Sequence, residues 1–200
     1  MAKVLVIDNA DSFTFNLVDL IERIGHESKT VRNTITPTEV LAWNPKAMVL
    51  SPGPSSPEFA GHLIDICQQC APKIPTLGVC LGLQAMVLAF GGKLGKLEIP
   101  VQGYASQVEH DGSGAFRSVP SPVLLGRYHA LYAKEVPVSF EVTARSVGKA
   151  LNQCQNVGVV MGIRHKTKPI EGFQFHPESI LSMPYGEMIL KQWFEEVGAK

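Results

Sequence analysis

The sequence predicts an α/β protein with a doubly wound, mostly parallel sheet, helices on both of its faces and added antiparallel strands. Short apolar runs alternate with amphipathic segments in the first half of the chain, as in parallel sheets joined by helices. After residue 92 the segments become short, β-branched and broken by glycine and proline, which indicates hairpins. No linker divides the 200 residues, so we expect one domain over 1–200.

The parallel part begins with Lys3–Asp8, a continuous apolar run that ends in an acid. A polar turn over 9–12 can cap the helix predicted over 13–24, which has apolar residues at helical spacing. Thr36, Pro37 and Glu39 form the start signal of a second helix. The remaining elements predicted here are strands over 27–32, 47–50 and 76–79 and a helix around 65–70.

The second half contains the predicted antiparallel strands, and it ends with one more strand of the central sheet. Each segment is rich in β-branched residues and is bounded by turn residues. The strands are predicted over 102–110, 122–128, 138–145, 157–163 and 170–175, and a terminal helix is predicted over 186–197.

Composition excludes several classes of protein. The net charge is zero and the pI is near 7, so nothing favours binding to nucleic acid or to an anionic membrane surface. No apolar run is long enough to span a bilayer, and the first residues lack the pattern of a signal peptide. We therefore expect a cytoplasmic protein whose four cysteines are free thiols.

The stretch Thr76–Met86 predicts a buried strand, a sharp turn at Cys80 and a helix that starts near Leu83. Gly78 and Gly82 bracket the cysteine and supply backbone freedom and clearance for this reversal. A side chain on such an elbow projects above the sheet, and the helix N-terminus favours a thiolate over a thiol. Cys80 is therefore a candidate nucleophile; the alternative is a buried cysteine that packs as a small hydrophobe.

The second chemical signal is the segment from His176 to Glu178. Pro177 keeps His176 extended, and residues two apart in an extended segment share a face, so Glu178 can orient the imidazole. A carboxylate-oriented histidine is the partner that a cysteine nucleophile needs. Among the other histidines, His129 follows a strand and is a second candidate. The rest are expected on the surface or in turns: His26, His62, His110 and His165.

Two further patterns carry less chemistry. The loop from Ser51 to Pro57 is rigid and follows a strand end, where α/β sheets place ligands, although it can also be a plain connector. Cys67 and Cys70 form a CxxC at a helix end, without the second pair that a zinc ribbon requires, and we expect no function for it. No residues have metal-ligand spacing, so no metal is assigned.

These motifs resemble those of the class I (triad) glutamine amidotransferases. The segment 78–84 resembles the nucleophile motif of that family, 173–179 its His-x-Glu motif and 51–54 its oxyanion strand. The segments 7–16 and 126–131 are similar to a narrower group, the glutaminase subunits of anthranilate synthase (component II) and of para-aminobenzoate synthesis.

The resemblance implies hydrolysis of L-glutamine through a thioester on Cys80, with His176 as acid and base and Glu178 as its partner. It implies an oxyanion hole from the backbone N–H groups of Leu81 and Gly53. The residues that would contact glutamine are Gly53, Pro54, Ser55, Gln84, Ala130 and Leu131. Ammonia would pass to a separate chorismate-using synthase subunit; this chain would hold no cofactor, and Mg²⁺ would belong to that partner.

The sequence departs from the family pattern at four positions. The family usually has Gly at Ser55, His at Leu83, Ser at Ala130 and Lys at Tyr104, although the triad and both oxyanion donors are present. The main hypothesis is the glutaminase of anthranilate synthase, with para-aminobenzoate (aminodeoxychorismate) synthesis as the alternative. Two other hypotheses remain open: a stand-alone cysteine hydrolase of another γ-glutamyl compound, and a non-catalytic scaffolding subunit of the same fold.

Overall fold

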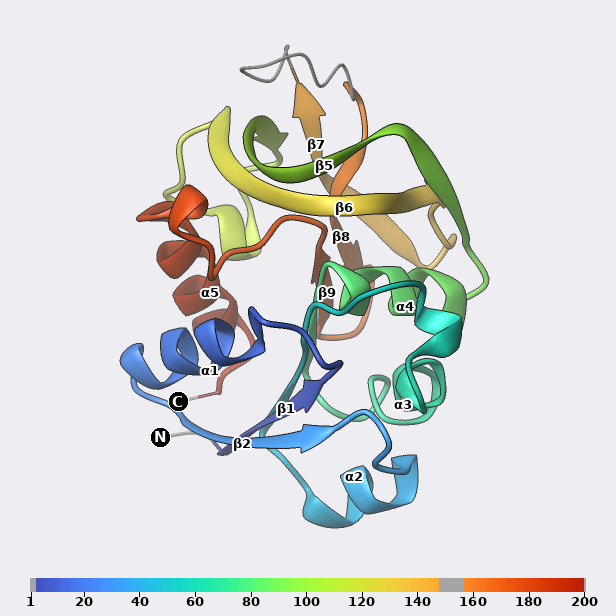
Figure 1. The fold of residues 1–200 in the computed structure, drawn as a ribbon. Coiled ribbons are helices and arrows are strands. Elements are labelled where there is room, and N and C mark those ends of the chain that lie inside the picture. The colour runs from blue at the N-terminus through green and yellow to red at the C-terminus, as the bar shows by residue number, and fades with distance from the viewer. Residues whose placement is uncertain (1–2, 148–156, 200) are drawn as a thin grey trace.

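The computed structural model describes residues 3–147 and 157–199 and contains one nine-stranded sheet (Figure 1). The strand order is β2-β1-β3-β4-β9-β8-β7-β5-β6. The strands are β1 (Lys3–Asp8), β2 (Glu27–Arg32), β3 (Ala47–Leu50), β4 (Thr76–Val79), β5 (Lys93–His110), β6 (Val123–Glu135), β7 (Phe140–Val147), β8 (Val160–His165) and β9 (Ile170–Phe173). The α-helices within the described residues are α1 (Thr14–Arg23), α2 (Pro37–Trp43), α3 (Leu63–Gln69), α4 (Leu81–Ala89) and α5 (Tyr185–Glu196).

The sheet has a parallel half and an antiparallel half that meet at β9. Strands β2, β1, β3, β4 and β9 pair in parallel, and helices α1 to α3 connect β1 to β4 as parallel pairing requires. Strand β9 pairs antiparallel with β8, and the sheet continues antiparallel through β7 and β5 to β6. The predicted fold class is confirmed.

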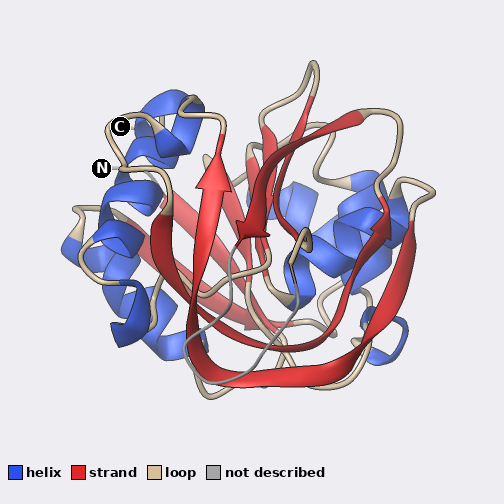
Figure 2. Cartoon of the chain, turned by 90° about the horizontal axis from the view of Figure 1, so that it is seen from above, coloured by secondary structure: helices blue, strands red, loops and turns tan. Residues whose placement is uncertain are grey.

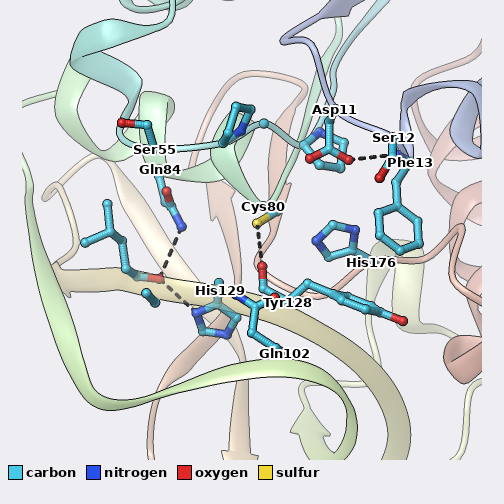
Figure 3. A pocket seen from close by; sticks show the side chains of 15 residues that line it. Asp11, Ser12, Phe13, Ser55, Cys80, Gln84, Gln102, Tyr128, His129 and His176 are labelled. Carbon is cyan, nitrogen blue, oxygen red and sulfur yellow. Dashed lines mark hydrogen bonds between the residues drawn. The ribbon is translucent and has the colours of Figure 1, made fainter.

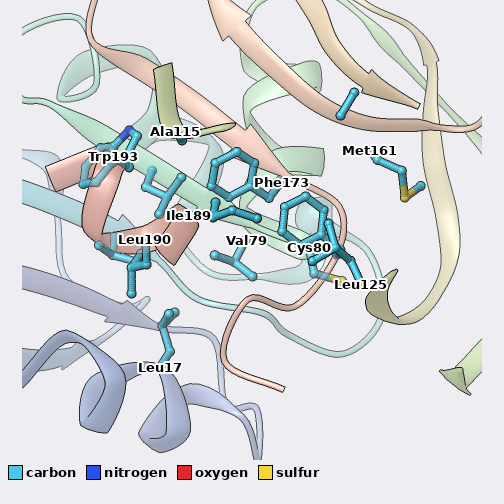
Figure 4. Packing of buried hydrophobic residues seen from close by; sticks show 14 of the residues in the cluster. Leu17, Val79, Cys80, Ala115, Leu125, Met161, Phe173, Ile189, Leu190 and Trp193 are labelled. Carbon is cyan, nitrogen blue, oxygen red and sulfur yellow. The ribbon is translucent and has the colours of Figure 1, made fainter. Parts of the chain in front are cut away.

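Helices cover both faces of the sheet (Figure 2). Successive side chains of a strand point to opposite faces, and β1 shows this directly. Val4 and Val6 pack in a cluster with α1 and α5, whereas Leu5 and Ile7 pack in a cluster with α2, α3 and α4. Figure 4 shows part of the first cluster, to which Cys80 belongs. Among the described helices, none is long and apolar enough to cross a membrane.

The structure corrects the predicted strand ends in the second half. Strands β5 and β6 have 18 and 13 residues and extend well beyond the predictions. Glycine and proline residues expected to end these strands lie instead at shifts in the pairing register. One such shift lies between Gln102 and Tyr104, around Gly103, which has φ +76°. Strand β9 ends at Phe173 because the following chain crosses to β6, where the His176 amide donates to the Gly126 carbonyl at 2.9 Å.

Three smaller corrections concern helices and a strand start. The capping box of α2 is present as predicted, with Thr36 and Glu39 bonding reciprocally. The predicted cap of α1 is wrong, because the N-cap is Phe13 and no side chain caps it. Helix α4 begins at Leu81 rather than near Leu83, and β8 begins three residues after the predicted start at Val157.

Candidate active site

Cys80 lies on a strained elbow between β4 and α4. Its backbone has φ +51° and ψ −100°, a region that side-chain-bearing residues rarely adopt and one associated with functional sites. The flanking glycines provide clearance. A Cβ on Gly78 would come within 2.6 Å of the Gly82 carbonyl carbon, and one on Gly82 within 2.6 Å of the Leu50 carbonyl oxygen. The left-handed conformation is thus adopted by Cys80 itself, while the glycines allow strand and helix to approach.

The two predicted oxyanion donors come from neighbouring segments. Leu81 is the first residue of α4, so its N–H is among those with no acceptor inside the helix. Gly53 lies against it: a Cβ on Gly53 would be 2.3 Å from the Leu81 side chain and 2.7 Å from the Cβ of Asn9. Asn9 holds this loop, because its side chain donates to the Ser51 carbonyl at 2.8 Å. Gly53 therefore has to be a glycine for steric reasons.

His176 and Glu178 form a buried pair. The Nδ1 of His176 lies 2.7 Å from Oε1 of Glu178, and both side chains are almost inaccessible to solvent. With Nδ1 donating to the carboxylate, Nε2 is the nitrogen left to exchange a proton, and it has no hydrogen-bond partner among the described residues. Figure 3 shows the His176 ring beside the Cys80 sulfur.

The surroundings of His176 favour its protonated form. Burial disfavours the charged imidazole, but the attraction of Glu178 and of the Cys80 sulfur outweighs burial and raises the pKa of His176 well above its ordinary value. The ring is also held by two aromatic neighbours: Phe13 and Tyr128 contact it edge to face at centroid distances of 5.2 and 4.9 Å. The site can therefore hold a proton on His176 beside the Cys80 sulfur.

A cavity of about 410 Å³ opens beside Cys80. This volume is large enough for a small amino acid. Leu81 and Glu178 do not line the cavity. The structure brings the other predicted site residues together on its wall: Gly53, Pro54, Ser55, Cys80, Gln84, Ala130, Leu131 and His176 (Figure 3).

The four departures from the family pattern fall in different places. Ser55 has φ +66°, which a glycine would adopt more easily, and it lines the cavity together with Ala130. Leu83 follows the nucleophile by three residues but does not line the cavity. Its side chain is fully buried against Gly172 of β9, outside the cavity wall. Tyr104 is 41% exposed on β5, also outside that wall.

His129 lies at the cavity wall, but its environment keeps it neutral. Burial, reinforced by the neighbouring Arg127 guanidinium, lowers the pKa of His129 to about 3. Its Nδ1 lies 2.8 Å from the Leu131 carbonyl and its Nε2 accepts from Arg127 at 3.0 Å. A neutral ring with both nitrogens engaged cannot act as an acid or a base, so His129 is a structural part of the wall.

The remaining candidates lie away from the cavity. None of His26, His62, His110 and His165 lines it. Cys67 and Cys70 are buried in and just after α3, where burial raises the pKa of both thiols. Cys67, Cys70 and Cys80 are free; the fourth cysteine lies outside the described residues. Within the described ranges, no group of three His, Cys, Asp or Glu residues could hold a metal ion.

Sequence reasoning missed several residues that build the site. Phe13, Gln102 and Tyr128 line the cavity, and Gln174 lies beneath it with its side-chain nitrogen 3.6 Å from the Cys80 sulfur. A signal for Gln174 was present: it precedes His176 by two residues in an extended segment, the same spacing that pointed to Glu178. Phe13 and Tyr128 had no such signal, because they approach His176 from distant segments.

Two named proteins are similar to this chain along most of its length. The anthranilate synthase component 2 of Methanocaldococcus jannaschii is 48% identical over 180 residues, which cover 90% of this chain and 86% of that protein. The aminodeoxychorismate/anthranilate synthase component 2 of Bacillus subtilis is 40% identical over 195 residues, covering 96% and 95%.

A solved structure shares the fold along nearly the whole chain. The crystal structure of a putative GMP synthase subunit from Thermoplasma acidophilum superimposes with a TM-score of 0.85 at 26% identity, covering 99% of this chain and 94% of that one. Residues 5–197 match the family described as glutamine amidotransferase class-I. The Cys80 elbow, the His176–Glu178 pair and this match lead to one conclusion: the chain belongs to the class I glutamine amidotransferases.

Proposed function

We propose that this chain is the glutaminase subunit of an anthranilate synthase. It hydrolyses L-glutamine to glutamate and ammonia and delivers the ammonia to a synthase subunit that uses chorismate. One observation carries the chemistry: the His176 ring, held by Glu178 at 2.7 Å, lies beside Cys80 at the wall of an open cavity. The proposed complex with a synthase subunit is supported by the M. jannaschii relative, which is 48% identical and is named anthranilate synthase component 2.

When the reaction begins, the proton of the Cys80 thiol has already moved to Nε2 of His176. The Cys80 thiolate attacks the side-chain amide carbon of glutamine, and the oxygen, now negatively charged, accepts hydrogen bonds from the N–H groups of Leu81 and Gly53. Each such preorganised donor contributes about 3–4 kcal/mol to the stability of the transition state. His176 then gives its proton to the amide nitrogen, the C–N bond breaks and ammonia departs. A γ-glutamyl thioester remains on Cys80.

Hydrolysis of the thioester completes the cycle. Water attacks the thioester carbon while His176 accepts its proton, and the C–S bond breaks to release glutamate and regenerate the Cys80 sulfur. Glu178 keeps Nδ1 protonated throughout, so that Nε2 always faces the reacting atoms. Protein groups and water suffice for these steps, so we propose no cofactor for this chain and place Mg²⁺ in the synthase partner.

The test is steady-state glutamine hydrolysis with and without an anthranilate synthase large subunit, with Cys80→Ala as control. We expect hydrolysis that rises with the partner and disappears in the variant. Absence of hydrolysis under both conditions, despite a demonstrated complex, would contradict the proposal and favour a scaffolding subunit. Hydrolysis that needs no partner at all would favour a stand-alone hydrolase of γ-glutamyl compounds.

The second candidate is the glutaminase subunit of aminodeoxychorismate synthase, on the route to para-aminobenzoate. The B. subtilis relative is named for both synthases, and its alignment covers 96% of this chain. The two candidates share the chemistry and differ in the partner. Stimulation of hydrolysis by an aminodeoxychorismate synthase large subunit, without stimulation by the anthranilate enzyme, would establish the second candidate.

A further inference from the structure

The nucleophile has a neighbour outside the triad. Gln174 is completely buried between the end of β9 and His176, and its Nε2 lies 3.6 Å from the Cys80 sulfur. This contact joins residues 94 positions apart in the sequence. A side-chain amide can present either its N–H or its oxygen to the sulfur, and the two have opposite effects on a thiolate. The orientation of Gln174 therefore decides what it does.

The surrounding hydrogen bonds determine that orientation. The Leu131 carbonyl can only accept, so the Gln84 group 3.1 Å from it is the NH₂ (Figure 3). The same Gln84 nitrogen lies 3.3 Å from one end of the Gln174 amide, which must then be its oxygen. Because the oxygen of Gln174 faces Gln84, its NH₂ faces Cys80. The assignment thus follows from a backbone group that cannot be reversed.

A second chain of contacts holds the Leu131 carbonyl in place. Arg127 is 1% exposed and only donates, so its Nε–H makes Nε2 of His129 an acceptor at 3.0 Å. The proton of the neutral His129 ring is therefore on Nδ1, which donates to the Leu131 carbonyl at 2.8 Å. Two donors, His129 and Gln84, converge on this one oxygen (Figure 3). Directed hydrogen bonds thus connect a buried guanidinium to the nucleophilic sulfur.

We propose that Gln174 is a further catalytic residue, whose side-chain amide donates a hydrogen bond to the Cys80 thiolate and is held in that orientation by Gln84. Hydrogen bonds to charged acceptors are stronger than those to neutral ones, so the contact favours the thiolate over the thiol. The Tyr128 carbonyl, 3.9 Å from the sulfur, acts in the opposite sense because it accepts from the thiol. When the proton moves to His176, Tyr128 loses a donor and the bond from Gln174 strengthens.

The role of Gln174 in turnover rests on the proposed glutaminase function, but its effect on the sulfur can be measured without glutamine. The readout is the rate of alkylation of Cys80 by iodoacetamide at a pH at least one unit below the midpoint of the wild-type pH–rate profile, divided by the limiting rate near pH 10. The ratio reports the thiolate fraction and cancels differences in access to the sulfur. Cys80→Ala supplies the background from the other thiols.

Gln174→Met is the main variant, and we expect it to lower this ratio about ten-fold, because a hydrogen bond to a charged group is lost. Gln192→Met is the matched control. Gln192 is also a buried glutamine, but it lies on α5 outside the cavity wall, and its variant should keep the wild-type ratio. A folded Gln174→Met protein with the wild-type ratio would overturn the proposal and leave Gln174 as a core residue.

Gln174→Leu provides a second test with a side chain of different shape. Neither leucine nor methionine can donate a hydrogen bond to the sulfur, so we expect the same fall in the ratio in both variants. A packing role predicts instead an effect that differs between the branched and the linear replacement. Circular dichroism and thermal unfolding show that each variant is folded. A reduced ratio in a protein without glutaminase activity would contradict the proposed function alone and leave the assignment of Gln174 intact.

Discussion

The two halves of the sheet build the cavity in different ways. In the parallel half, β3, β4 and β9 have only four residues each, and the site residues follow their ends: Gly53 after β3, Cys80 after β4 and His176 after β9. In the antiparallel half, β5 and β6 have 18 and 13 residues, and the site residues lie within the strands. Gln102 belongs to β5, and residues 128–131 belong to β6.

Under the proposed function, the reacting groups all lie in the parallel half, whereas β6 contributes to the wall that contacts glutamine. Turns at strand ends can project a side chain and leave backbone N–H groups unpaired, as a nucleophile and an oxyanion hole require. In a long paired strand, the backbone amides are used in hydrogen bonds to the neighbouring strands. Such a strand contributes side chains, which point alternately to its two faces. We therefore expect changes in the parallel half to lower kcat and changes in β6 to raise KM.

The largest expected effect comes from His176→Asn, in the parallel half. Asparagine fills part of the space but cannot exchange a proton, so kcat for glutamine hydrolysis should fall by about 10³-fold or more. KM should change little. His62→Asn, outside the cavity, is the control. Retention of activity within about ten-fold of the wild type would place the proton transfer elsewhere.

The second prediction concerns the pH dependence of stability that arises from Glu171 of β9, at the junction between the two halves. Burial raises the pKa of Glu171 from 4.5 to about 7, although Arg164 of β8, 3.2 Å away, opposes the shift. A raised native pKa means that the folded state binds the proton more tightly than the unfolded chain. The resulting stability is fully present below about pH 4.5 and is lost as the pH rises through about 7.

Glu171→Gln removes this titration. Between about pH 4.5 and pH 8, the free energy of unfolding of the wild type should fall by roughly 2–3 kcal/mol more than that of the variant. Urea unfolding at several pH values measures both curves. Glu27→Gln, on the exposed side of β2, should follow the wild type. Parallel curves for the wild type and Glu171→Gln would show that Glu171 titrates normally.

A smaller effect is expected from Ala130→Leu, in the antiparallel half. The half-buried Ala130 lines the cavity, and a leucine there would occupy space that glutamine needs. We expect KM to rise about ten-fold while kcat stays within about three-fold. Lys134→Leu adds the same side chain to an exposed position of β6 and should leave both constants unchanged. A loss of kcat without a change in KM would show that this strand takes part in the chemistry.

The smallest effect is that of Ser55→Gly, in the loop after β3. Relief of the strained φ of +66° favours glycine by about 1 kcal/mol or more, whereas the greater freedom of glycine in the unfolded chain costs about 0.5–1 kcal/mol. We expect a net gain in stability of about 0.5 kcal/mol, measured by urea unfolding, and a KM within about two-fold. Clear destabilisation would mean that the Ser55 hydroxyl makes a contact that offsets its strain.

Local patterns predicted the parallel half well. Continuous apolar runs predicted β1, β3 and β4 almost to the residue, and the capping box predicted α2. The elbow at Cys80 and the spacing of His176 and Glu178 were equally local, since each depends on backbone periodicity over three or four residues. The same rule could have identified Gln174. Strand ends in the antiparallel half were predicted poorly, because glycine and proline there produce bulges instead of breaks.

By itself, the sequence predicted the residues that we propose for the chemistry: a cysteine between two glycines and a histidine with a carboxylate two residues later. Only the tertiary structure decided what surrounds them. Strand order and register bring Gln174 to Cys80 across 94 residues, and Leu131 to Gln84 across 47. They also direct the Leu83 side chain toward Gly172 and away from the cavity. The physical reason is that local geometry repeats along a chain, whereas contacts between distant segments depend on how whole strands pair and pack.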